Sequence, residues 1–166
     1  RDVALKYKTE IFETKIGELN IVDKIRDIGI EDTFAGEENG GLIFPDFASC
    51  RNGPLAAAVL IKIVAKEKKK YSELIGNLPQ YKLVKENVHV KKSEIEIIIE
   101  HLKKTYASYE LNTLDGVKIV FDSESWIIIR PSGTEPVIRI FSEAKNTEKA
   151  SENRDMIKNE ICKASN

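Results

Sequence analysis

The chain has 166 residues, which is enough for one compact domain or two small ones. Its 42% hydrophobic and 32% charged residues are typical of a globular protein and exclude a disordered one. A formal net charge of −1 gives no overall field to attract nucleic acid or an anionic membrane, so any anion must be bound by local groups.

The same composition bears on the setting of the protein. No apolar run approaches the roughly 20 residues that span a bilayer, and the first residues lack the order of a secretion signal. We therefore expect a cytoplasmic protein with no membrane or nucleic-acid partner. The chain opens on Arg1 and enters a helical pattern at once, so we expect it to be cut from something longer. Cys50 and Cys162 lack metal spacing, and we expect unpaired, buried thiols.

The first 79 residues alternate between predicted helices and strands. A helix opens the chain, IFET at 11–14 is expected as a short strand, and LNIVDKIRDIG is an amphipathic helix that Gly29 closes. DTFAG and LIFPD are predicted strands on either side of a glycine-rich turn. A long helix follows, with Pro54 at its first position and Asn52 or Gly53 as its cap. This alternation predicts a layered α/β fold.

The rest of the chain predicts a smaller α+β domain with an antiparallel sheet packed on helices. KLVKENVHV is strand-like, and Ser93 with Glu96 forms a capping box before an apolar helical stripe. Three antiparallel strands and a helix from Thr147 complete the order. GNLPQ carries the turn residues of a domain boundary, so we expect domains at 1–78 and 79–166.

A polar stretch, RPSGTEP, separates two runs of alternating apolar residues. Arg130 offers two parallel donors to a phosphate, and Ser132 and Thr134 add hydroxyl groups. Gly133 lets the backbone turn, so that successive N–H groups can converge on one anion. The alternative is a tight type I turn, with Pro131 at its second position, that needs no ligand.

A second polar loop, GEENGG, follows a predicted strand. Glu37, Glu38 and Asn39 place two carboxylates and an amide between glycines, and such groups can hydrogen-bond sugar hydroxyls. A solvated acidic turn would explain the same residues. A metal site is a weak alternative, because no second carboxylate cluster with suitable spacing appears.

Four motifs, ETKIGE, GEENGGLIFPD, CRNG and RPSGTEP, occur in this order along most of the chain. In this order they resemble the α-D-phosphohexomutases, which include phosphomannomutase, phosphoglucomutase and phosphoglucosamine mutase. The resemblance implies the C-terminal half of a four-domain enzyme: an incomplete three-layer α/β domain 3, truncated at its N-terminus, and domain 4. The implied reaction moves phosphate between C1 and C6 of a hexose, through a phosphoserine and a hexose 1,6-bisphosphate.

The resemblance also implies roles for particular residues. Glu37 and Asn39 would contact sugar hydroxyls, and the KIGE turn would lie in the same cleft. The phosphate that is not transferred would be bound by RPSGTEP. The residues concerned are Arg130, Ser132, Gly133 and Thr134 for the phosphate and Lys15, Gly17 and Glu18 for the turn.

Other parts of the family pattern are missing from the sequence. No serine stands in a TASHNP-like context, and no DGDxDR-like cluster could bind Mg²⁺. The nucleophile and the metal ligands are therefore expected in missing N-terminal domains, and the chain alone should not catalyse. Some relatives carry histidine where this sequence has Gly41, which puts an acid/base role there in doubt. His89 and His101 fall outside the motifs and are interpreted as structural or surface residues.

Two other functions fit parts of the sequence. A stand-alone phosphosugar- or anion-binding module would need neither nucleophile nor metal. An RNA-binding α/β domain is weaker, because the charge is near neutral and an aromatic RNP-like pattern is lacking.

Overall fold

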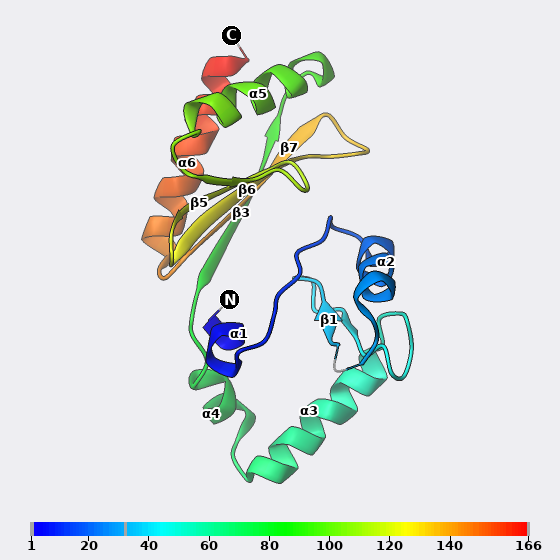
Figure 1. Cartoon of the computed structure of the whole chain (residues 1–166). Helices are drawn as coiled ribbons and strands as arrows, with labels where there is room; N and C mark the ends of the chain where they lie inside the picture. Colours follow the sequence, from blue (N-terminus) through cyan, green and yellow to red (C-terminus); the bar gives the residue numbers. More distant parts are fainter. Residues whose placement is uncertain (1, 32, 166) are drawn as a thin grey trace. The chain divides into compact units, whose positions relative to one another are not determined.

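The computed structural model describes residues 2–31 and 33–165 and divides the chain into two compact units, Arg1–Pro79 and Gln80–Asn166 (Figure 1). The division falls inside the linker region expected around GNLPQ. Each unit has its own cluster of buried apolar residues. None of the described helices is long and apolar enough to cross a membrane.

The first unit combines helices with one short strand pair. The helices are α1 (Asp2–Tyr7), α2 (Glu18–Ile28), α3 (Gly53–Glu67) and α4 (Tyr71–Gly76), and the antiparallel strands are β1 (Ala35–Gly36) and β2 (Leu42–Ile43). Its core is small: Ile43 of β2 packs with the apolar stripe of α2, which comprises Ile21, Val22 and Ile25. The stop expected for α2 is confirmed, because Gly29 follows it with a φ of 96°.

The start of α3 follows directly from its sequence. The Asn52 side chain accepts a hydrogen bond of 2.9 Å from the N–H of Leu55, so Asn52, rather than Gly53, is the N-cap. Pro54 lies in the first turn, where its missing N–H costs nothing. The strand predicted at IFET is wrong. In the described part of this unit the pairings are that of β1 with β2 and an isolated bridge between Phe44 and Ala48. Residues 11–14 take part in neither of them, and a strand needs a neighbouring strand to pair with.

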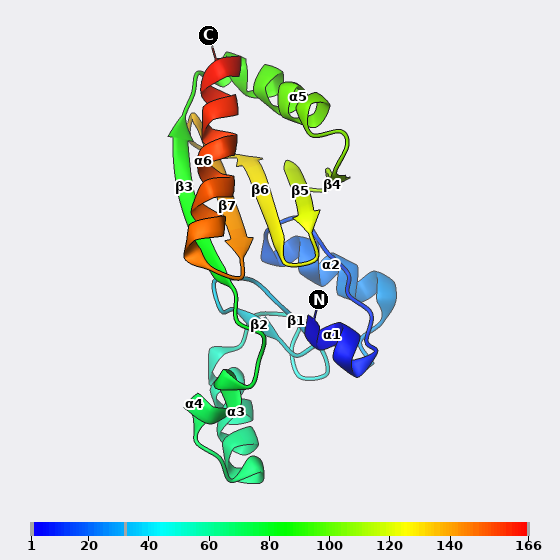
Figure 2. The same ribbon diagram turned by 90° about the vertical axis from the view of Figure 1, so that its left-hand side faces the viewer.

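The second unit is a five-stranded antiparallel sheet with two covering helices (Figure 2). The strand order is β3-β7-β6-β5-β4. The strands are β3 (Lys82–His89), β4 (Glu110–Asn112), β5 (Val117–Asp122), β6 (Ser125–Pro131) and β7 (Val137–Ala144), and the helices are α5 (Ile95–Thr105) and α6 (Thr147–Ala164). The short edge strand β4 was not predicted. The predicted α/β and α+β mixture is confirmed.

Alternation along the strands decides which side of this sheet is buried. On β6, Ile127 and Ile129 are fully buried, whereas Trp126, Ile128 and Arg130 are half-buried on the opposite face. Both helices pack on the first face, through Ile98 and Leu102 of α5 and Ile157 and Ile161 of α6. The other face, which carries Arg130, is therefore not covered by α5 or α6.

The start of α5 differs from the prediction. A short 3₁₀ turn, η1 (Lys92–Glu94), precedes the α-helix. The Glu94 carboxylate accepts hydrogen bonds from the backbone N–H (3.3 Å) and the Nζ (2.9 Å) of Lys91, so the predicted box of Ser93 and Glu96 is replaced by one two residues earlier. The extra turn shifts the cap upstream. The predicted apolar stripe is confirmed, since Ile98, Leu102 and Tyr106 are buried.

The prediction for the cysteines is wrong in one respect. Neither forms a disulfide, but both are exposed. Cys50 lies in the loop before α3, and Cys162 follows Ile161 on α6, off the buried stripe that Ile157 and Ile161 define. The exposure of Cys162 follows from its position around the helix, which the usual burial of cysteine does not take into account.

Candidate functional site

The RPSGTEP stretch forms a loop between two central strands of the second unit. β6 ends at Pro131 and β7 begins at Val137, so residues 132–136 make the connection. The N–H of Ser132 donates to the carbonyl of Val137 (2.9 Å), and the Pro136 carbonyl accepts from the N–H of Val90 (3.1 Å). The connection is a five-residue loop rather than the tight type I turn considered from sequence.

Hydrogen-bond donors converge on one oxygen inside this loop. The Oγ of Ser132 accepts from the N–H of Thr134 (3.4 Å), the N–H of Glu135 (3.3 Å) and the Nη2 of Arg139 (3.4 Å). These distances exceed the usual N–H···O separation of about 2.9 Å, so the bonds are weak. Backbone N–H groups that point together in this way form an anion-binding concavity. The donors of this loop therefore point toward one place but form only weak hydrogen bonds there.

Arg130 lies next to this loop on β6. Its side chain is 17% exposed, and its Nη1 is 3.4 Å from the Oδ2 of Asp115. Its Nε is buried and has no hydrogen-bond partner within the described part of the chain. A buried donor without a partner costs free energy unless a ligand supplies the acceptor.

Arg139, which the sequence did not single out, is brought opposite Arg130 by the register of β6 and β7. Like charges directly opposite each other on a sheet destabilise the pair. Each arginine has one nearby carboxylate, Asp115 for Arg130 and Glu135 for Arg139, and both ion pairs are long at 3.4 Å. An anion with several oxygens would relieve this repulsion better than either carboxylate does.

A glycine supports the strand that carries Arg130. Gly116, in the turn before β5, has a φ of 79°, which L side chains rarely adopt. A Cβ there would lie 2.3 Å from the carbonyl oxygen of Ile129 and 3.0 Å from the Cα of Arg130. This glycine thus permits the turn to pack directly against β6.

The GEENGG loop of the first unit connects β1 and β2. The N–H of Glu37 donates to the Gly41 carbonyl, and the N–H of Gly40 donates to the Glu37 carbonyl, each at 3.0 Å. Gly40 has a φ of 89°, and the Oδ1 of Asn39 accepts from the N–H of Gly41 (3.0 Å). The loop is closed by its own backbone, and Asn39 is exposed at its tip.

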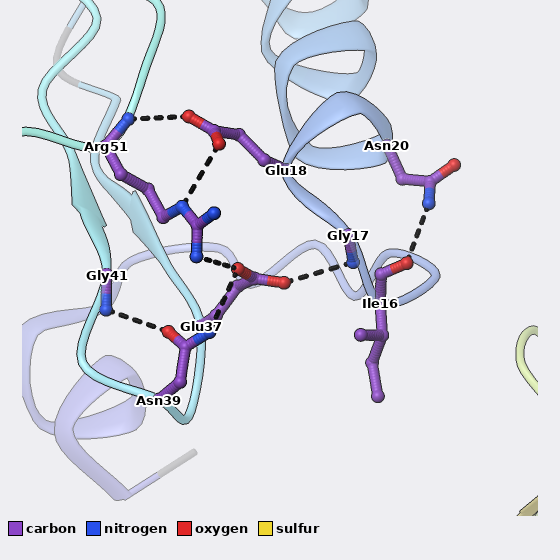
Figure 3. A network of polar contacts seen from close by, with 8 residues as sticks. All are labelled: Ile16, Gly17, Glu18, Asn20, Glu37, Asn39, Gly41 and Arg51. Carbon is purple, nitrogen blue, oxygen red and sulfur yellow. Dashed lines mark hydrogen bonds and ion pairs between the residues drawn. The ribbon is translucent and has the colours of Figure 1, made fainter. Parts of the chain in front are cut away.

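Three of the sequence motifs meet at the Glu37 carboxylate, as Figure 3 shows. Its Oε1 accepts from the N–H of Gly17 in KIGE (3.0 Å), and its Oε2 accepts from the Nη1 of Arg51 in CRNG (3.2 Å). Glu18 joins through the same arginine. Lys15 is exposed, and its backbone carbonyl accepts a hydrogen bond from the Oγ1 of Thr14 (2.9 Å). The structure therefore brings Gly17, Glu18 and Glu37 together.

Arg51 binds both oxygens of the Glu18 carboxylate. Its Oε1 accepts from the backbone N–H of Arg51 (2.7 Å) and its Oε2 from the Nε (3.1 Å). These contacts lower the pKa of Glu18, the backbone hydrogen bond most of all. Arg51 stood in a motif noted in the sequence, but nothing in the linear order of residues showed that it joins two carboxylates.

The other titratable residues that the structure describes form no further candidate site. Among the described residues, no three His, Cys, Asp or Glu side chains gather as a metal site, so those residues do not fit the Mg²⁺ that the resemblance implies. His89 is exposed on β3. The Nε2 of His101 lies 3.1 Å from the Oε2 of Glu160 and links α5 to α6.

Each of the two units matches a known family of protein domains. Residues 1–81 match the profile of phosphoglucomutase/phosphomannomutase, alpha/beta/alpha domain III, and residues 60–160 match that of phosphoglucomutase/phosphomannomutase, C-terminal domain. The chain belongs to the phosphoglucomutase/phosphomannomutase family.

Individual relatives agree with this assignment. A "Phosphoglucomutase/phosphomannomutase" of Thermococcus kodakarensis is 43% identical over 91% of this chain and 33% of that protein. A "Probable phosphoglucosamine mutase" of Methanopyrus kandleri is 37% identical over 88% of this chain and 32% of that protein. The chain thus spans about a third of the length of the curated relatives it matches.

A solved structure supports the fold. A phosphoglucomutase/phosphomannomutase family protein from Burkholderia thailandensis superposes with a TM-score of 0.79 and 22% identity, over 99% of this chain and 35% of that one. At this identity the likeness bears on the fold alone.

Proposed function

We propose that this chain supplies the phosphate- and sugar-binding parts of a phosphohexomutase. The complete protein would interconvert hexose 1-phosphate and hexose 6-phosphate through a phosphoserine and a hexose 1,6-bisphosphate. The observation that carries the proposal is the convergence of three donors on the Oγ of Ser132, with Arg130 beside them. Membership of the family supports the class of reaction.

In this proposal the RPSGTEP loop binds the phosphate that is not transferred. Arg130 supplies charge and parallel donors, Gly133 lets the backbone turn, and the N–H groups of Thr134 and Glu135 leave the Ser132 hydroxyl for the phosphate oxygens. The bisphosphate must present either phosphate for transfer, so the loop has to accept the phosphate on C1 as well as that on C6. Fixing one end of the substrate contributes by positioning, which dominates phosphoryl transfer.

Glu37 and Asn39 are proposed to hydrogen-bond sugar hydroxyls. Both side chains have internal partners, but Asn39 is exposed at the loop tip, whereas the Glu37 side chain is 12% exposed. Asn39 is therefore the more accessible of the two. Lys15 remains a candidate for the same site because it is exposed two residues before Gly17.

The nucleophilic serine and the Mg²⁺ ligands are proposed to lie outside this chain. When bound, Mg²⁺ would offset charge on the transferring phosphate. The chain alone is accordingly expected to bind without turnover. A cytoplasmic location also stays a proposal, based on the composition.

Calorimetric titration of the 166-residue chain with glucose 1-phosphate and glucose 6-phosphate tests the phosphate site. Both ligands should bind, glucose without phosphate should bind far more weakly, and inorganic phosphate should compete. Arg26→Ala is a matched control, because Arg26 forms only an exposed ion pair with Asp23. Equal affinity for glucose and its phosphates would contradict the proposal.

The alternative is a phosphosugar-binding module without catalysis. The described residues favour it only in that they contain binding loops and no gathered metal ligands. Assaying a longer protein that contains this chain separates the two. Conversion of glucose 1-phosphate that Arg130→Ala suppresses supports the mutase, whereas binding without conversion in every form supports the module.

A further inference from the structure

The backbone conformation of Gly41, at the end of the GEENGG loop, does not require a glycine. The φ of Gly41 is not positive, unlike that of Gly40 at 89°. Space is what excludes a side chain at this position, because a Cβ on Gly41 would lie 2.2 Å from the Cδ and 3.1 Å from the Cγ of Arg51. The Arg51 side chain therefore occupies the place that a side chain at residue 41 would take.

From that place Arg51 connects two carboxylates of different segments. Its Nε donates to the Oε2 of Glu18 (3.1 Å) and its Nη1 donates to the Oε2 of Glu37 (3.2 Å), as Figure 3 shows. A guanidinium can do this because its N–H groups form a rigid planar fork. The loop between β1 and β2 is thereby tied to the first turn of α2.

The backbone around Arg51 is itself fixed. Its own N–H donates to the Oε1 of Glu18 (2.7 Å), and the N–H of Asn52 donates to the carbonyl of Leu42 in β2 (3.0 Å). Asn52 also caps α3. A side chain that orients another group needs such support from rigid elements.

The charge of Arg51 matters as well as its shape. Glu37 and Glu38 are consecutive in the loop, and unscreened carboxylates would repel a phosphorylated sugar. The Glu37 side chain is only 12% exposed, so solvent screens it less than an open surface group. An arginine at 3.2 Å offsets that charge.

We propose that Arg51 is the positioning residue of the GEENGG loop. It holds the Glu37 carboxylate in place and offsets its charge for a phosphorylated hexose, and Gly41 is a glycine because it admits the Arg51 side chain. This inference rests on the proposed sugar-binding function of the loop.

A double-mutant cycle on the 166-residue chain tests the proposal, using Gly41→Ala, Arg51→Ala and the combination. One readout is the amide signal of Gly17, whose N–H donates to Glu37, and the other is the affinity for glucose 1-phosphate. Each single substitution should shift the Gly17 signal and weaken affinity about five- to tenfold. The combination should be no weaker than Arg51→Ala alone, because truncating Arg51 removes the two nearest atoms that an alanine at 41 would meet, the Cδ at 2.2 Å and the Cγ at 3.1 Å.

Gly53→Ala and Arg26→Ala serve as controls. A Cβ on Gly53 would meet no atom within 4 Å, and Arg26 lies outside the network, so neither should change the readouts. The amide signals of the second unit report whether each variant is folded. Independent, multiplying effects of the two substitutions, or an unmoved Gly17 signal in Arg51→Ala, would overturn the proposal.

Failure of the proposed function is recognised separately. If the unmodified chain does not bind glucose 1-phosphate, the sugar-binding function fails. The Gly17 signal then still decides whether Arg51 positions Glu37, since that readout needs no ligand.

Discussion

The two candidate loops differ in how their charged groups are satisfied. In the first unit, the Glu37 carboxylate has a cation at 3.2 Å and a backbone donor at 3.0 Å. In the second, the N–H groups of Thr134 and Glu135 donate to a neutral hydroxyl at 3.4 and 3.3 Å, and the Nη2 of Arg139 has that hydroxyl and the Glu135 carboxylate at 3.4 Å each. A buried Nε of Arg130 has no partner within the described residues. The Glu37 carboxylate of the first loop is therefore satisfied by internal partners. The donors of the second loop have weak internal partners and are available to a ligand.

This difference separates two ways of building a recognition site. A carboxylate that reads hydroxyls must be held in a fixed orientation, and an internal ion pair does so. A site for a charged phosphate must instead leave cations without good internal partners, at a cost in stability. The following substitutions test the comparison.

Gly116→Ala should have the largest effect, because it disturbs the strand that carries Arg130. The φ of 79° and the 2.3 Å approach to the Ile129 carbonyl predict a loss of about 2–4 kcal/mol in the free energy of unfolding. Chemical denaturation measures this. Gly133→Ala is the control, since a Cβ there meets no atom within 4 Å and should change stability little. An unchanged unfolding curve for Gly116→Ala would refute the packing described here.

Arg130→Ala should remove the strongest phosphate contact. We expect a loss of about 2 kcal/mol in binding free energy, or roughly 30-fold in affinity for glucose 6-phosphate. Calorimetry gives the affinity, and the amide spectrum confirms that the sheet is intact. Undiminished affinity would show that the clamp lies elsewhere.

Arg139→Ala should lower the affinity for phosphate without lowering the stability of the fold. Removing one of two opposed cations should leave stability unchanged or slightly higher, while affinity falls by about 1 kcal/mol, or roughly fivefold. Thermal unfolding and calorimetry on the same sample test both parts. A large loss of stability with full affinity would mean that Arg139 is structural.

The smallest effect concerns the titration of Glu18. Because its pKa is lowered in the folded state, its bonds to Arg51 stabilise the fold above the ordinary value of 4.5 and are lost as the pH falls through the folded pKa. The side-chain carboxyl signal of Glu18 should therefore titrate below pH 4.5. In Arg51→Ala the midpoint should rise without fully returning, since the backbone donor stays. A midpoint at or above 4.5 in the unmodified chain would contradict the network.

Local sequence patterns predicted much of the fold. The three-and-four spacing of Ile98, Leu102 and Tyr106 gave the buried stripe of α5, and Asn52 with Pro54 gave the start of α3. IFET failed because strand formation requires a partner strand, which composition does not reveal. The three-residue strand β4 is too short to show alternation.

The candidate site was predictable where a motif held the residues together. RPSGTEP and GEENGG are contiguous, so their candidates could be named from the sequence. Arg139 could not, because it meets Arg130 only through the register of β6 and β7. Arg51 joins residues 14 and 33 positions away, so its role depends on how the chain folds back.

The most direct test of the central claim follows the amide signals of Thr134 and Glu135 while inorganic phosphate is added to the unmodified chain. We predict that both signals shift and saturate as the N–H groups leave the Ser132 hydroxyl for the anion, and that Arg130→Ala suppresses the change. Signals that do not move at millimolar phosphate would contradict the account and leave RPSGTEP as a connection between two strands.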